Sequence, residues 1–184
     1  MSFLKKDKKT IVYTAKECAF LAVFVAILIA VQTVLSAVPG VELVTVLFIS
    51  YSFVAGAKRG MFAATAFSLL RQLVFGFSPT VLILYLIYYN LLTLTFGLFG
   101  RRIDIKGKHL PIIVGMACVG TVFFTGIDCV LTPLWYQYSQ KAALLYAYAA
   151  LPFMIPQLIC TAVSVAALFF PLIKTFKLAL KSIL

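Results

Sequence analysis

The basic residues of this chain occur in clusters that are separated by long apolar stretches. Fourteen of the sixteen Lys and Arg residues fall into four clusters: Lys5/Lys6/Lys8/Lys9/Lys16, Lys58/Arg59, Arg101/Arg102/Lys106/Lys108 and Lys174/Lys177/Lys181. Loops rich in Lys and Arg tend to stay on the cytoplasmic side of a membrane. If all four clusters lie on that side, the chain crosses the bilayer an even number of times between each pair. The pattern predicts a multi-pass membrane protein whose two termini are both cytoplasmic.

Composition supports the membrane assignment and argues against nucleic acid as a partner. Hydrophobic residues make up 64% of the chain and charged residues 11%, unlike an average soluble domain. The net charge of +11 would suggest nucleic acid in a soluble protein, but here the basic residues flank apolar segments, where anionic lipid attracts them. The apolar run that begins at Cys18 is too long for a cleavable signal peptide. We therefore expect one transmembrane domain over residues 1–184.

The apolar runs predict an all-α integral membrane protein, a bundle of six transmembrane helices. A spanning helix needs about 20 apolar residues. The expected helices cover approximately residues 15–38, 41–57, 61–75, 80–99, 110–131 and 151–173. The second segment is short for a full span. Pro39-Gly40 and the segment 76–79 are expected to turn outside the membrane, and a long outer connection is expected at residues 132–150.

Three charged residues away from the basic clusters are expected in the outer half of the bilayer. At 1.5 Å per residue, Arg71 stands roughly 17 Å above Gly60 and Asp128 roughly 27 Å above Leu110. Glu42 follows the outer turn at Pro39-Gly40. Charged residues at such depths usually face a cavity or a partner. Arg71 could bind a ligand, or it could form a structural ion pair with Asp128. Glu42 could also face the ligand, or simply suit the N-terminus of its helix.

Aromatic and amide side chains suggest a small-molecule site near these charges. Tyr85 and Tyr89 lie one helical turn apart and run inward from the outer surface. Stacking rings and a few polar anchors are typical of such sites. An interfacial aromatic belt would explain the same enrichment without a ligand. The expected substrate-binding set is Arg71, Gln72, Tyr85, Tyr89, Asn90, Asp128, Trp135 and Glu42.

A row of small residues on the first helix indicates a surface for close helix packing. Spacings of four and three place its members on one face: Ala15, Ala19, Ala22, Ala26, Ala30, Thr33 and Ala37. Small side chains let another helix approach closely in lipid. The partner could be another subunit, or helices two or six of the same chain. We find no nucleotide-binding loop, metal-ligand spacing or catalytic constellation, and His109 is interpreted as a loop residue.

The chain resembles the substrate-binding S component of an energy-coupling factor (ECF) transporter. The resemblance rests on its length, six expected helices, cytoplasmic termini, the Ala-x-x-x-Ala row and the outward polar-aromatic site. It implies that the chain captures a vitamin or related small heterocycle outside the cell membrane, most naturally a bacterial plasma membrane. It also implies a transmembrane coupling subunit at the Ala row (Ala15/Ala19, Ala22/Ala26 or Ala26/Ala30) and two cytoplasmic ATPases that use ATP. The chain itself needs no cofactor.

Two other functions fit the same sequence. A self-contained small channel or secondary transporter would normally show inverted repeats or broken helices, and Pro152 and Pro156 give slight support for the latter. An accessory membrane protein that binds only protein partners would leave Arg71 and Asp128 with structural roles.

Overall fold

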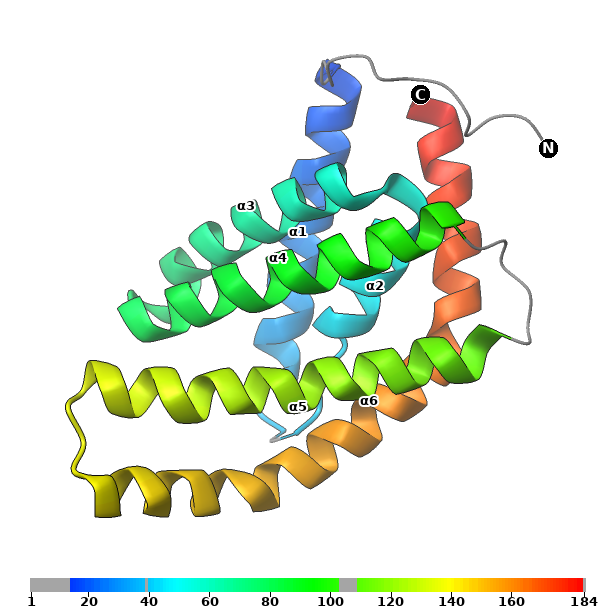
Figure 1. Ribbon diagram of the computed structural model, residues 1–184. Helices are drawn as coiled ribbons and strands as arrows, with labels where there is room; N and C mark the ends of the chain where they lie inside the picture. Colours follow the sequence, from blue (N-terminus) through cyan, green and yellow to red (C-terminus); the bar gives the residue numbers. More distant parts are fainter. Residues whose placement is uncertain (1–13, 39, 103–108, 184) are drawn as a thin grey trace.

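The computed structural model describes residues 14–38, 40–102 and 109–183, and these residues form six helices and no strand (Figure 1). The helices are α1 (Ala15–Leu35), α2 (Val44–Ala55), α3 (Ala57–Phe75), α4 (Pro79–Arg102), α5 (Leu110–Trp135) and α6 (Gln140–Ile183). The all-α prediction is therefore confirmed for the described part of the chain.

Four of these helices, α1, α4, α5 and α6, are long and apolar enough to cross a membrane, judged by length and composition. Helix α2 has only 12 residues, so it rises roughly 18 Å, well short of a hydrocarbon core of about 30 Å. Helix α3 has 19 residues but carries Lys58, Arg59 and Arg71. Four long apolar helices are typical of a membrane protein.

Helix boundaries differ most from expectation around the turn between α5 and α6. The long connection expected at residues 132–150 is wrong, because only residues 136–139 separate the two helices. The segment that follows Gln140 is rich in Ala and Leu, which favour helix. Helix α1 also ends three residues earlier than expected, at Leu35. Pro39 lies outside the described residues.

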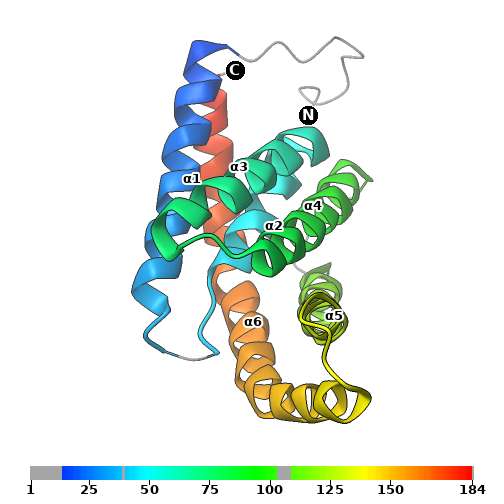
Figure 2. The same cartoon turned by 90° about the vertical axis from the view of Figure 1, so that its left-hand side faces the viewer.

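Helix α6 is strongly bent, and the bend divides it into two parts. Its first part lies beside α5, whereas its second part turns away and ends near the start of α1 (Figures 1 and 2). Pro152, Pro156 and Pro171 all lie inside the helix. Proline removes a backbone hydrogen bond and clashes with the preceding turn, so it kinks a helix rather than ending it where packing holds both sides.

Helix α2 occupies the centre of the molecule and contacts α1, α3, α4 and α6. Nine of its twelve residues are buried, so it is a core element rather than a lipid-facing one. Phe48 packs against Phe67 of α3 and Tyr89 of α4, with ring centroids 5.4 and 4.7 Å apart. Tyr51 stacks on Phe24 of α1 at 4.4 Å. Aromatic packing therefore joins three helices to α2.

Two glycines allow a tight corner between α2, α3 and α4. Gly56 adopts φ +88° between α2 and α3, a conformation that other residues rarely take. Gly97 of α4 lies so close to α3 that an added Cβ would come within 2.4 Å of the Ala57 backbone. Helix α4 consequently packs directly against the start of α3.

An ion pair joins the N-terminal end of α1 to α3. Thr14 and Glu17 form a capping box, each side chain bonding the other residue's backbone N–H. The same Glu17 carboxylate accepts a hydrogen bond from Arg59 of α3. Among the described residues this is the only ion pair, so it fixes the start of α1 beside α3.

Candidate functional site

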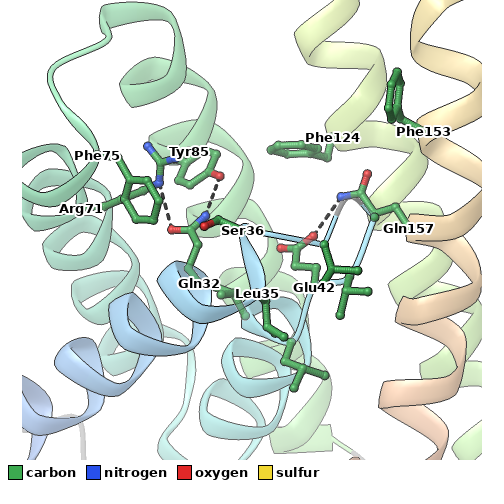
Figure 3. A pocket seen from close by; sticks show the side chains of 15 residues that line it. Gln32, Leu35, Ser36, Glu42, Arg71, Phe75, Tyr85, Phe124, Phe153 and Gln157 are labelled. Atoms are coloured by element: carbon green, nitrogen blue, oxygen red, sulfur yellow. Dashed lines mark hydrogen bonds between the residues drawn. The ribbon is translucent and has the colours of Figure 1, made fainter.

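All six helices and the segment between α1 and α2 contribute to the lining of a cavity of about 270 Å³ (Figure 3). We name it the Arg71 cavity. Its lining mixes charged, amide and aromatic side chains: Gln32, Leu35, Ser36, Val38, Gly40, Val41, Glu42, Leu43, Val44, Arg71, Phe75, Tyr85, Phe124, Phe153 and Gln157. Such a set of polar anchors among rings and aliphatic groups is the usual lining of a small-molecule site.

The guanidinium of Arg71 is held in place by two rings and one amide. Its central carbon lies 4.4 Å from the ring centre of Phe75 and 4.6 Å from that of Tyr85. Its Nε donates a 2.9 Å hydrogen bond to Gln32 Oε1. The Gln32 amide nitrogen in turn donates to the Tyr85 hydroxyl at 2.9 Å. Side chains from α1, α3 and α4 thereby fix the position of one cation (Figure 3).

Glu42 lies on another side of the cavity, where neutral donors surround its carboxylate. Tyr89 and Thr45 donate hydroxyl hydrogen bonds to Oε1 at 2.8 and 3.0 Å. Gln157 of α6 donates from Nε2 to Oε2 at 2.9 Å. The Glu42 backbone N–H also bonds the Cys160 sulfur at 3.3 Å. Glu42 therefore joins α2, α4 and α6.

A second cavity, of about 330 Å³, adjoins the first and contains Asp128. We name it the Asp128 cavity. Asp128 accepts hydrogen bonds from Tyr146 at 2.7 Å and from Thr132 at 2.8 Å. Three residues line both cavities: Phe124, Phe153 and Gln157. The two spaces are neighbours separated by these side chains of α5 and α6.

The structure does not form the alternative ion pair between Arg71 and Asp128. Arg71 bonds Gln32, and Asp128 bonds two hydroxyl groups on α5 and α6. In the described residues the one ion pair is Glu17–Arg59. Among the described residues, no ion pair therefore joins α3 to α5.

The remaining predicted site residues fall outside the cavity linings. Tyr89 is buried and reaches the Arg71 cavity only through its bond to Glu42. Gln72 is buried and accepts a hydrogen bond from the Ser78 backbone. Asn90 bonds Thr65 and the Leu86 carbonyl. Trp135 is half exposed at the end of α5, as expected of a residue at a membrane interface.

Two amides and three rings of the lining were not predicted from the sequence. Gln32 and Gln157 are isolated amides within apolar helices, and that isolation was a usable signal, since burying an amide in lipid is costly. Phe75, Phe124 and Phe153 carry no such signal, because the chain contains 17 Phe residues and most serve packing. Only the helix arrangement distinguishes these three from the rest.

The row of small residues on α1 faces away from the chain's own helices. All seven members are exposed: Ala15, Ala19, Ala22, Ala26, Ala30, Thr33 and Ala37. The buried face of α1 instead presents larger residues such as Phe24 and Leu28. Internal packing therefore does not explain the row in this structure.

Comparisons with known proteins add no family assignment. The chain matches no protein-family model, no curated protein and no solved structure. Within the described residues, no group of three His, Cys, Asp or Glu side chains could hold a metal ion. The two neighbouring cavities together present one cation, two carboxylates, two amides and several rings.

Proposed function

We propose that this chain is the substrate-binding S component of an ECF-type importer, which captures a vitamin-like micronutrient and delivers it inward. The observation that carries the proposal is the Arg71 cavity, a polar and aromatic space inside an otherwise apolar helical chain. Membrane proteins rarely bury charged residues without a functional reason. Here Arg71 and Glu42 both line the same cavity.

The exposed α1 row supports a second part of the proposal, a contact with a membrane coupling subunit. Small residues allow close helix approach, which is the main source of helix association in lipid. The row and the cavity use different faces of α1, since Gln32 lines the cavity while Ala22, Ala26 and Ala30 are exposed. One surface can therefore bind the coupling subunit while the other binds substrate. Two cytoplasmic ATPases would supply the energy.

The finer topology belongs to the same proposal: six membrane-embedded helices with both termini in the cytoplasm. The start of α1, the start of α3 and the ends of α4 and α6 carry basic residues. These four helix ends lie in the same upper part of the molecule in both views (Figures 1 and 2). Their clustering supports a single cytoplasmic side. The short α2, enclosed by the other helices, would return the chain to the cytoplasmic side without facing lipid.

Two measurements test the proposal together. The chain is expressed with an ECF coupling subunit and its two ATPases, and the assembly is isolated through a tag on the coupling subunit. We expect this chain to co-purify. Mass spectrometry of the gently purified chain is expected to detect a stoichiometric small molecule. A chain that carries ligand but never joins the complex would favour a self-contained transporter. A chain that joins protein partners but carries no ligand would favour an accessory protein.

A further inference from the structure

We infer that the ligand of the Arg71 cavity is a small ring compound bearing an acid group, and that Arg71 pairs with this group. This ligand class makes the proposed function more specific, and only its role in transport rests on that proposed function. The ligand class follows from the contacts of Arg71, from the position of the carboxylates and from the size of the cavity.

The contacts of Arg71 include no acidic partner among the described residues, so its charge is left for a ligand. Two rings contact the guanidinium and Gln32 accepts from Nε, so its orientation is fixed. No acidic side chain of the described residues lies within ion-pair distance of it. An isolated Arg in a membrane protein is costly and usually pairs with a partner. The planar edge of a guanidinium matches a carboxylate or phosphate in a bidentate manner.

The charges around the cavity define which end of the ligand meets Arg71. Arg71 lies on the side of Phe75 and Tyr85, whereas Glu42 lies on the side of Phe124 and Gln157 (Figure 3). Asp128 adds a second carboxylate in the adjoining cavity. Like charges repel strongly where water is scarce. An acid group is therefore directed toward Arg71 and away from both carboxylates.

Glu42 differs from Arg71 because its own bonding needs are already met. Tyr89, Thr45 and Gln157 together donate three hydrogen bonds to its carboxylate oxygens. Neutral hydroxyl and amide donors can satisfy a carboxylate without a cation. Arg71 is thus the charged group of this cavity that still lacks a counter-ion, and an anionic group of the ligand would supply one.

The size and walls of the cavity favour a compact ring. A volume of about 270 Å³ lies just below the usual range of small-molecule sites. Tyr85, Phe75, Phe124 and Phe153 supply aromatic surface around this volume. A monocyclic acid offers one face for stacking and one edge for Arg71. The acid could belong to a soluble molecule, or the anion could be a lipid headgroup phosphate, and the experiment separates these sources.

The test uses 4-fluorobenzoate as the probe and 4-fluorobenzamide as its neutral isostere. The full chain is reconstituted in phosphatidylcholine nanodiscs, and the ¹⁹F linewidth of each probe is followed during protein titration. We expect saturable binding of the benzoate and binding of the amide weaker by about tenfold or more, because the amide cannot form a charge-assisted pair. Equal affinity for the two probes, or no saturable benzoate binding, would overturn the inference.

Variants assign the effect to Arg71. Arg71→Gln should weaken benzoate binding by about tenfold or more, whereas Arg71→Lys should keep part of it because the charge remains. Arg102→Gln is the matched control, because Arg102 is exposed at the far end of α4, and it should bind benzoate normally. If Arg71→Gln does not fold, the Lys variant still decides, since a partial loss of benzoate affinity is expected and full affinity in Arg71→Lys would remove Arg71 from the site. Full benzoate affinity in folded Arg71→Gln would remove Arg71 from the site.

A parallel experiment with an anionic lipid identifies the source of the acid group. Nanodiscs containing phosphatidylglycerol should leave benzoate binding unchanged if the natural ligand is a soluble acid. Displacement of the probe by this lipid would instead show that a headgroup phosphate occupies Arg71, and would overturn the soluble-ligand assignment. Failure of the transport proposal looks different: the probe would bind through Arg71, but the chain would not assemble with a coupling subunit.

Discussion

Arg71 donates a 2.9 Å hydrogen bond from Nε to Gln32 Oε1, which joins α3 to α1 at the wall of the cavity. The same Gln32 amide donates to the Tyr85 hydroxyl on α4. One side chain therefore orients both a guanidinium and a phenol. Because the amide has its acceptor toward Arg71 and its donor toward Tyr85, no apolar residue can replace it.

Gln32→Leu should lower the affinity for ligand more than it lowers the stability of the folded protein. The substitution removes two hydrogen bonds and frees Arg71, so we expect affinity for 4-fluorobenzoate to fall by about fivefold to tenfold. Probe titration measures the affinity, and thermal unfolding in detergent measures the stability. Thr95→Leu is the control, because Thr95 is exposed on α4 and bonds only its own helix. Unchanged affinity in Gln32→Leu would show that Arg71 does not depend on this amide.

Tyr89→Phe should destabilise the protein by about 1.5–3 kcal/mol, because a buried hydroxyl that donates to a carboxylate is lost. Tyr89 is buried and bonds Glu42 at 2.8 Å. We expect a lower midpoint of thermal unfolding in detergent. Tyr148→Phe provides the matched control, since Tyr148 is 69% exposed, and its midpoint should match the wild type. A stable Tyr89→Phe variant would mean that Thr45 and Gln157 suffice for Glu42.

Gly97→Ala should destabilise the protein, whereas Gly115→Ala should not. A Cβ at Gly97 would meet the backbone of Ala57 at 2.4 Å, so α3 and α4 would have to separate. Overpacking of this kind costs about 1–3 kcal/mol. A Cβ at Gly115 meets nothing within 4 Å, and Ala favours helix there. Equal unfolding midpoints for the two variants would contradict the close packing of α3 against α4.

Ala26→Trp should prevent assembly with a coupling subunit while leaving probe binding intact. Ala26 is exposed on the α1 row, so a large side chain should not disturb the chain's own core. It would hold a partner helix away and lose packing on both sides. Val119→Trp is the control, because Val119 is 70% exposed on α5, a different helix from the one that carries the row. Normal co-purification of folded Ala26→Trp would exclude this part of the row as the interface.

Cysteine labelling in cells should place residues 103–109 inside and the α5–α6 turn outside. In a background without native cysteines, Ser139→Cys should react with an impermeant maleimide added outside, and Lys106→Cys should not. The reason is the retention of basic loops in the cytoplasm. Labelling of Lys106→Cys from outside, or protection of Ser139→Cys, would reverse the proposed topology. Lys106 lies outside the described residues, so this experiment supplies independent information.

The all-α class of this protein and the position of most of its helices could be predicted from the amino-acid sequence. Long apolar runs must form helices in lipid, because every backbone polar group needs an internal partner. The row of small residues was also visible in the sequence, since a helical period places its members on one face. Arg71, Glu42, Tyr85 and Asp128 were identified as candidates because charge and polarity stand out against an apolar background.

Which of these residues contact one another depends on how the helices pack. Arg71 bonds Gln32 rather than Asp128, and Glu42 accepts from Gln157, 115 positions away. The bend of α6 brings Phe153 and Gln157 to the cavity. The exposure of Ala26 shows that the row lies on the face of α1 that points away from the other helices. Helical periodicity specifies which residues share a face, but it does not specify which faces pack together. That choice depends on side-chain contacts between helices, such as the close approach at Gly97 and the rings around Phe48.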